Sequence, residues 1–217
     1  VLIDRRFYAK IQWQVTLTGV AKNGSYLYQA NASAPRDYPL THVAENVSLT
    51  LNGSSVSMNY ADALQAFKRY NTDWDLTQYD LTGCPTMLDK FAQYSSGMDS
   101  NRNSLASYQA SGAEQGRGAF HLDSITGNTI GDGVASKTVV IKFTTVEPLF
   151  LSPLLYSSGD LGAGLLGVNN IGVNINFSGN LERVWSHYGQ ALAVGDITTV
   201  ATIGNGATAV PELMVEY

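Results

Sequence analysis

A strict alternation of apolar and polar residues near the start of the chain constrains its fold more than any other feature. Within residues 7–20 the apolar members share one face of an extended chain, and the intervening Gln and Thr residues share the other; the apolar members are Ile11, Trp13, Val15 and Leu17. Side chains alternate across a strand with a period of two residues, so this segment predicts a half-buried β-strand.

The strongest hairpin signal lies between residues 46 and 59. Two alternating runs, 46–51 and 55–59, flank the pair Asn52-Gly53. A type I′ turn requires positive φ at both central residues, and Asn-Gly is the pair that adopts it most readily. A second turn is predicted at Asn23-Gly24, with a return strand that starts at residues 26–28.

Most of the remaining chain also has the character of strands, with a loop that contains Pro35 and Pro39. The other strand candidates are residues 119–123, 137–146, 168–177, 181–185, 197–203 and 212–217. The sequence contains neither a fixed repeat nor alternating β-α-β units, so it predicts an all-β antiparallel sandwich of jelly-roll type. We expect one domain over residues 1–217, because sandwiches often exceed 200 residues.

One insertion, at residues 60–116, interrupts this pattern. Helical spacing favours short helices at 61–70 and 86–94, and residues 95–118 form a polar run rich in Gly and Ser. Loops of that length in a compact domain are usually functional or mobile. We therefore expect the insertion to lie outside the wall of the sandwich, with the run 95–118 as its most mobile part.

The composition points to a surface that partners cover. Charged residues make up 14% of the chain, against about 25% in typical domains, and tyrosine, common in buried contacts, occurs 12 times. The net charge is -5 and the chain has no basic run, so it lacks the electrostatic footprint of a nucleic-acid-binding protein. Because no apolar run reaches about 20 residues, we also predict no membrane span.

No arrangement of residues predicts catalysis. The histidines lie far apart, no serine stands in a Gly-x-Ser-x-Gly elbow, and residues 162–167 lack the Lys-Ser/Thr that follows a phosphate loop. His121 and Asp123 fall on one face of a predicted strand; they suit either a pair of metal ligands or, the favoured interpretation, an exposed strand face. The single cysteine, Cys84, excludes an internal disulfide. We expect no catalytic residue, cofactor or metal.

Three segments resemble coat proteins of small icosahedral viruses, including viruses with circular single-stranded DNA. They are residues 147–155 (EPLFLSPLL), residues 164–171 (GLLGVNNI) and the hairpin at 46–59. The resemblance places the chain in no particular family. It implies a jelly-roll structural protein that assembles with copies of itself into an icosahedral capsid around the genome, and therefore a place in the virion.

The resemblance also implies partners beyond other copies. Such coat proteins usually carry a basic N-terminal arm that contacts the genome, and this chain has none. The chain begins with an apolar run and ends in what looks like an unfinished strand, so we expect a segment cut from a longer protein whose basic tail is absent here. Candidate contacts with a neighbouring subunit or a host receptor are the aromatic and arginine residues of the insertion: Trp74, Tyr79, Tyr94, Arg102, Tyr108 and Arg117.

Two other classes of protein remain open on the sequence. The first is a secreted or phage-tail sandwich that resembles a lectin, in which Trp74, Tyr79 and Tyr94 would stack on sugar rings. The second is an enzyme whose active site assembles from distant residues, as a catalytic triad can. A glycan array would identify the first class, and a bound metal ion would favour the second.

Overall fold

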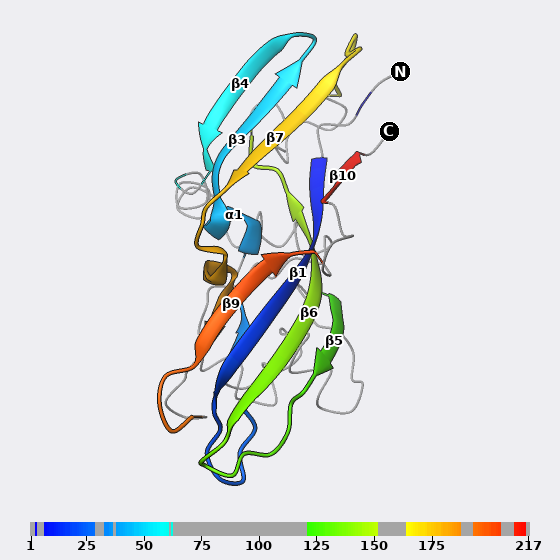
Figure 1. Cartoon of the computed structure of the whole chain (residues 1–217). Helices are drawn as coiled ribbons and strands as arrows, with labels where there is room; N and C mark the ends of the chain where they lie inside the picture. The colour runs from blue at the N-terminus through cyan, green and yellow to red at the C-terminus, as the bar shows by residue number, and fades with distance from the viewer. Residues whose placement is uncertain are drawn as a thin grey trace, which may run out of the picture.

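The computed structural model describes residues 3, 7–28, 33–36, 38–60, 62, 121–151, 164–187, 193–204 and 211–215. The strands of these parts are β1 (Phe7–Val20), β2 (Ser33–Pro35), β3 (Ala44–Leu51), β4 (Ser54–Asn59), β5 (His121–Thr126), β6 (Ser136–Pro148), β7 (Ile171–Phe177), β8 (Trp185–His187), β9 (Thr198–Ile203) and β10 (Glu212–Val215). The helix α1 (Pro39–Val43) and a 3-10 helix, η3 (Leu181–Val184), complete the described elements. Figure 1 shows that the described residues form an elongated arrangement built mostly of strands.

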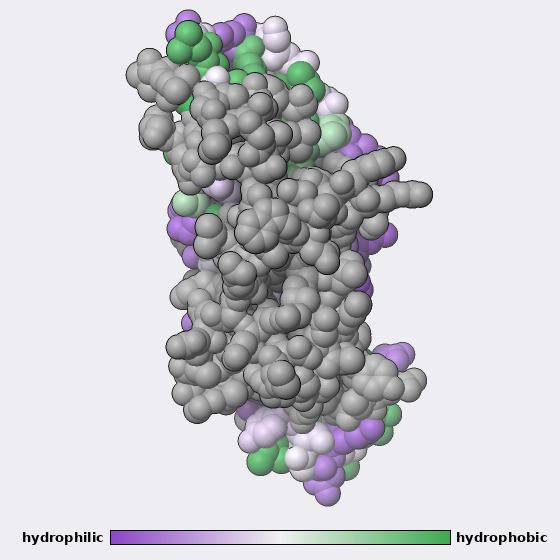
Figure 2. All heavy atoms as spheres, turned by 180° about the vertical axis from the view of Figure 1, so that it is seen from behind, coloured by the Kyte–Doolittle hydropathy of each residue, from purple (hydrophilic) through white to green (hydrophobic). Residues whose placement is uncertain are grey.

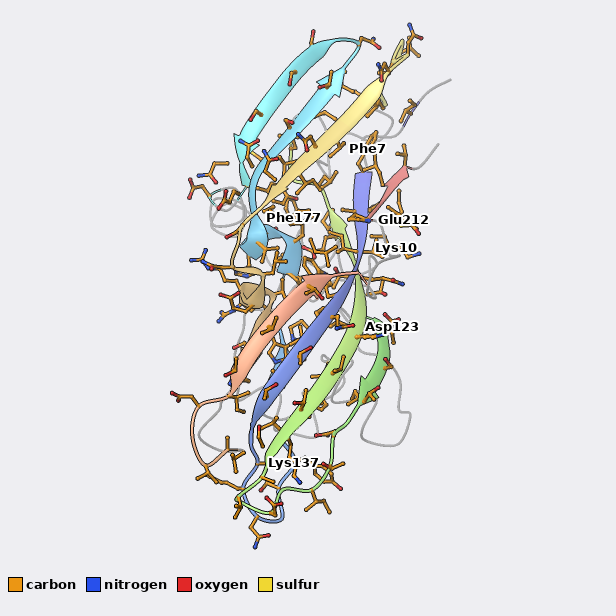
Figure 3. All side chains as sticks on the ribbon, viewed as in Figure 1. Phe7, Lys10, Asp123, Lys137, Phe177 and Glu212 are labelled. Carbon is orange, nitrogen blue, oxygen red and sulfur yellow. The ribbon has the colours of Figure 1, made fainter. Side chains whose placement is uncertain are left out.

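The predicted first strand, β1, is the centre of the largest sheet, whose order is β10-β1-β6-β5. On one side β1 pairs with β6 from Tyr8 to Val20. On the other side two strands share it, because β10 pairs with its first four residues and β9 with the stretch from Trp13 to Thr18. Lys10 and Glu212 face each other across β1 and β10, and their side chains form an ion pair of 3.1 Å (Figure 3).

A three-stranded sheet, β4-β3-β7, lies in the upper part of Figure 1, with α1 between it and β1. A two-stranded sheet, β2-β8, completes the described pairings, and every one of these pairings is antiparallel. The architecture confirms the predicted all-β antiparallel fold of jelly-roll type.

The apolar face of β1 forms the centre of the core, as its alternation predicts. Ile11, Trp13, Val15 and Leu17 are all at most 1% exposed, and they lie opposite the inward residues of β6. The indole Nε1 of Trp13 donates a hydrogen bond of 2.9 Å to the hydroxyl of Thr145, so the one polar atom of this ring is satisfied. The same apolar cluster extends into β3, and one continuous core therefore joins the two large sheets.

The hairpin at 46–59 forms as predicted, from β3 and β4. Its turn residues, Asn52 and Gly53, have φ angles of 47° and 87°. Both central residues thus have the left-handed backbone conformation that a type I′ turn requires.

Replacing Gly53 by valine is expected to lower the free energy of unfolding by about 1–3 kcal/mol, because a β-branched residue is strained at positive φ. A Cβ at Gly53 would meet no neighbour within 4 Å, so backbone strain alone acts there. The matched control is Gly179→Val, where a Cβ also meets no neighbour and φ is not positive. Chemical denaturation of the two variants checks the turn; equal stability would contradict the assignment.

Three sequence predictions outside this hairpin need correction. Residues 26–28 form no return strand, because the side chain of Asn128 accepts from the amide of Tyr28 and donates to its carbonyl, in place of a strand partner. Residues 181–184 form the 3-10 helix η3, and the strand begins only at Trp185. The loop predicted around Pro35 and Pro39 contains β2 and α1 instead. Proline at the first helical position has its φ angle already suited to a helix, which explains the start of α1.

Candidate functional site

The six candidate contact residues of the insertion lie outside the described residues: Trp74, Tyr79, Tyr94, Arg102, Tyr108 and Arg117. Except for Asp62, the two predicted helices lie there as well, together with the run 95–118 and Cys84. Their roles stay predictions. The two coat-like segments and the hairpin are largely described, however, and their contacts show what these sequences do.

The first coat-like segment begins with a buried acid, Glu147, which is 1% exposed. Both oxygens of its carboxylate accept from the backbone amide of Leu40, at 2.8 and 2.9 Å. One oxygen also accepts from the hydroxyl of Thr145, at 3.1 Å. The amide of Leu40 belongs to the first turn of α1, where no helical partner exists for it. Glu147 thus attaches α1 to the end of β6.

The next residues of the segment fix the end of the β3-β4 hairpin. The hydroxyl of Tyr60 donates to the carbonyl of Pro148 and accepts from the amide of Phe150, both at 3.1 Å. The ring of Phe150 packs edge-on against Tyr38, with centroids 5.3 Å apart, and stacks on Tyr60 at 6.5 Å. All three rings are at most 2% exposed. Residues 147–151 therefore join the sheet of β1 to the sheet of β3 through the core.

The second coat-like segment is held by the hairpin turn. The amide group of Asn52 donates to the carbonyl of Gly167 at 2.8 Å, and its side-chain oxygen accepts from the amides of Asn169 and Asn170 at 2.8 and 3.2 Å. Leu165 also exchanges two backbone hydrogen bonds with Ile3. Asn52 consequently has two roles, as the first residue of the turn and as the anchor of the loop before β7.

The outer face of the β4-β3-β7 sheet carries no charged side chain among its paired positions. Its three rows, read across the strands, are Asn59-Asn46-Asn176, Ser57-Ser48-Asn174 and Ser55-Thr50-Gly172. Residues directly opposite each other in a sheet share a face, and every member of the rows is exposed or half-buried. These rows therefore form one continuous polar face without charge. Another neutral surface can approach it without like-charge repulsion.

The described residues contain no cluster of potential metal ligands. Within them, no three side chains of His, Cys, Asp and Glu gather as a metal ion would require. The pairing of β5 shifts its register between Leu122 and Ser124, so the regular alternation behind the His121 and Asp123 prediction is interrupted. Asp123 accepts from the hydroxyl of Thr144 at 2.8 Å.

His187 lies in β8, half-buried, with Nδ1 3.5 Å from the hydroxyl of Thr199. Burial lowers the pKa of His187, since desolvation disfavours the charged imidazolium. Lowering its pKa keeps this ring neutral at physiological pH. None of the helices that the structure describes is long and apolar enough to span a membrane.

Sequence reasoning missed Glu147 and the second role of Asn52. A signal for Glu147 existed, since it is in phase with Val139, Ile141 and Phe143 along β6 and so lies on the buried face. An acid at such a position has to find hydrogen-bond donors inside the protein. The contacts of Asn52 had no such signal, because they join residues more than 100 positions apart.

Comparisons with known proteins agree with the coat-like segments. A family model described as the first domain of the Sputnik virophage major capsid protein matches residues 1–217. The putative capsid protein V20 of Sputnik virophage is 24% identical over 212 residues, which are 94% of this chain and 33% of that protein. This chain thus spans about a third of the length of that relative.

Two solved structures share the fold. The structure of the Sputnik virophage determined by cryo-electron microscopy matches 99% of this chain and 41% of its own, with a TM-score of 0.66 and 19% identity. The crystal structure of the mavirus major capsid protein matches 99% of this chain and 40% of its own, with a TM-score of 0.67 and 15% identity. The match of the family model over the whole chain establishes that this chain belongs to the family of the first domain of the Sputnik virophage major capsid protein, a family of viral capsid structural proteins.

Proposed function

We propose that this chain is a jelly-roll domain of a capsid protein, and that copies of the full-length protein assemble into an icosahedral shell around a viral genome. The observation that carries the proposal is the match of a capsid-domain family over residues 1–217, together with a fold shared with two virophage capsid structures. In this role the protein is structural and catalyses no reaction. Its place is then the capsid of the virion.

The internal contacts suit a structural role. Glu147, Tyr60 and Asn52 each join segments that are distant in sequence, through hydrogen bonds to backbone groups. A shell subunit has to keep its shape while neighbours bind it, and binding costs least when the contact surfaces are already ordered. The uncharged outer face of the β4-β3-β7 sheet adds a surface on which copies meet without repulsion.

The proposal includes one domain over residues 1–217, with residues 60–116 as an insertion that contacts a neighbouring subunit or a host receptor. The genome would bind through a basic tail beyond this chain, because the net charge of the chain itself is -5. A circular single-stranded DNA genome remains a prediction of the sequence resemblance alone.

Sizing of the full-length protein by light scattering tests the proposal. We expect particles of many copies at high protein concentration and moderate salt. A clean monomer under these conditions would overturn the proposed function.

Trypsin should distinguish free subunits from assembled particles if the insertion is an assembly contact. We expect cleavage near Arg102 and Arg117 to be fast in free subunits and slow in particles, because a neighbouring copy would cover the chain there. Heat-denatured protein from both preparations serves as the control and should be cut at one common rate. Equal rates in native subunits and native particles would contradict an assembly contact. The insertion would then face a receptor or be a passive surface loop.

A further inference from the structure

The same tripeptide, Asn-Gly-Ser, occurs in two turns of the described chain, at residues 23–25 and 52–54. The first turn follows β1 and the second joins β3 to β4, so they lie at opposite ends of the described strands (Figure 1). Figure 2 shows hydrophilic residues at both ends. Asn23 and Asn52 are exposed, and the glycine after each has a positive φ, of 75° and 87°. Sequence and exposure therefore give the two asparagines the same chemistry.

An asparagine followed by glycine can lose its side-chain amide without an enzyme. The backbone nitrogen of the glycine attacks Cγ of the asparagine, a new N–Cγ bond closes a cyclic succinimide, and the Cγ–Nδ2 bond breaks. Ammonia leaves with the proton that the glycine amide gives up. Water then opens the ring at one of its carbonyl carbons and yields either aspartate or isoaspartate. Glycine favours the attack because no Cβ hinders its nitrogen.

The fold restrains the side chain of Asn52. Its Nδ2 donates to the carbonyl of Gly167 at 2.8 Å, and its Oδ1 accepts from the amides of Asn169 and Asn170 at 2.8 and 3.2 Å. Ring closure needs the reacting atoms in a near-attack arrangement. The side chain has to give up its bonds before Cγ can move toward the nitrogen of Gly53, so the loop before β7 protects Asn52.

The side chain of Asn23 has no such restraint. Within the parts of the chain that the structure describes, it makes no hydrogen bond. The attacking nitrogen is restrained instead, because the amide of Gly24 donates to the carbonyl of Gly131 at 3.0 Å. Reaction at Asn23 therefore breaks one hydrogen bond, whereas reaction at Asn52 breaks three.

We propose that Asn23 is a site of spontaneous deamidation in the folded protein, and that its hydrogen bonds protect Asn52 from the same reaction. Each hydrogen bond that has to break raises the barrier modestly, and two additional bonds correspond to a reaction about tenfold slower. The inference stands apart from the proposed function, since the reaction needs only the folded domain and water.

Deamidation changes the connection after β1 in two ways. Aspartate at position 23 adds a negative charge to a chain whose net charge is -5. Isoaspartate also lengthens the backbone by one carbon atom, next to two hydrogen bonds. One runs from the amide of Ser25 to the carbonyl of Lys22 at 2.9 Å, and the other from the amide of Gly24 to Gly131. Their loss is expected to lower the unfolding midpoint by about 2–4 °C in a domain of this size.

Peptide mapping by mass spectrometry of the full-length protein tests the proposal. The protein is incubated at physiological temperature and mildly alkaline pH, where a backbone amide gives up its proton more readily, and is sampled over time. Trypsin cleaves after Arg36, between the two asparagines, so they fall in separate peptides, and fragmentation identifies the residue that has become an acid. Thermal unfolding of each sample monitors the fold.

The shared tripeptide supplies a matched control within the chain. In urea-unfolded protein both turns lose their restraints, and we expect one common rate. In the native protein we expect Asn23 to react about tenfold faster than Asn52. The variant Asn23→Gln, whose longer side chain closes a ring far less readily, should keep its unfolding midpoint through the incubation. A midpoint that falls equally in this variant and in the wild type would contradict the expected effect of the modification.

Three results for the native protein would overturn the proposal. The first is an equal rate at the two asparagines. The second is a faster reaction at Asn52, which would mean that the amides of Asn169 and Asn170 activate its side-chain carbonyl for attack. The third is an unchanged Asn23 under conditions in which the unfolded chain reacts at both turns, because the bond from Gly24 to Gly131 would then suffice for protection.

Discussion

Replacing Phe150 by alanine is expected to lower the free energy of unfolding by about 3–5 kcal/mol. Phe150 is 2% exposed, and its ring packs against Tyr38 and Tyr60, which come from opposite ends of the segment that contains α1, β3 and β4. Alanine would leave a cavity where these three aromatic residues meet, and the two remaining rings would lose their shared partner. Urea denaturation followed by tryptophan fluorescence measures the change.

The control for this variant is Leu166→Ala. Leu166 is also a large apolar residue of a coat-like segment, but it is 81% exposed. Its replacement should change the free energy of unfolding by less than about 0.5 kcal/mol, as is usual for surface positions. If both variants were equally stable, the aromatic cluster would not hold the two sheets together.

Replacing Glu147 by alanine is expected to cost about 2–4 kcal/mol of stability, the second large effect. The substitution removes the acceptor for the amide of Leu40 and for the hydroxyl of Thr145, and both groups are buried. Each buried donor left without an acceptor costs about 1–3 kcal/mol. The same denaturation experiment measures the loss.

Two comparison variants make the Glu147 prediction specific. Glu147→Gln keeps one carbonyl oxygen as an acceptor, so we expect it to retain part of the lost stability. Glu45→Ala removes an acid from an exposed position of β3 and should have an effect below about 0.5 kcal/mol. Equal stability of Glu147→Ala and the wild type would show that α1 does not depend on this carboxylate.

Local patterns in the sequence predicted the strands that have one buried face. The alternation in residues 7–20 and 168–177, the β-branched run at 137–146 and the pair Asn52-Gly53 all correspond to described elements. These signals succeed because burial of one face imposes a period of two, and because a two-residue turn needs residues that accept positive φ.

The failures share a different physical origin. Residues 26–28 follow the predicted Asn23-Gly24 turn, yet the side chain of Asn128 takes both backbone hydrogen bonds of Tyr28. Residues 181–184 also look suitable for a strand, but they lie where the chain leaves β7 and begins β8, and they form a 3-10 helix there. At residues 26–28 the deciding contact comes from a residue 100 positions away, and no local pattern contains that information.

The candidate site shows the same division between local and distant information. The resemblance of residues 147–151 and 164–171 to coat proteins was visible in the sequence, but the reason for these residues was not. Their role depends on Leu40, Tyr60 and Asn52, which lie about 90 to 120 positions away. The contact residues predicted in the insertion lie outside the described residues and remain predictions.

Electron cryo-microscopy of the full-length protein, at a concentration where light scattering detects particles, tests the capsid assignment most directly. The proposal predicts closed shells with icosahedral symmetry, and density into which the sandwich of β1, β6, β3 and β7 fits as a repeated unit. Only single molecules, or open filaments without closed symmetry, would contradict it.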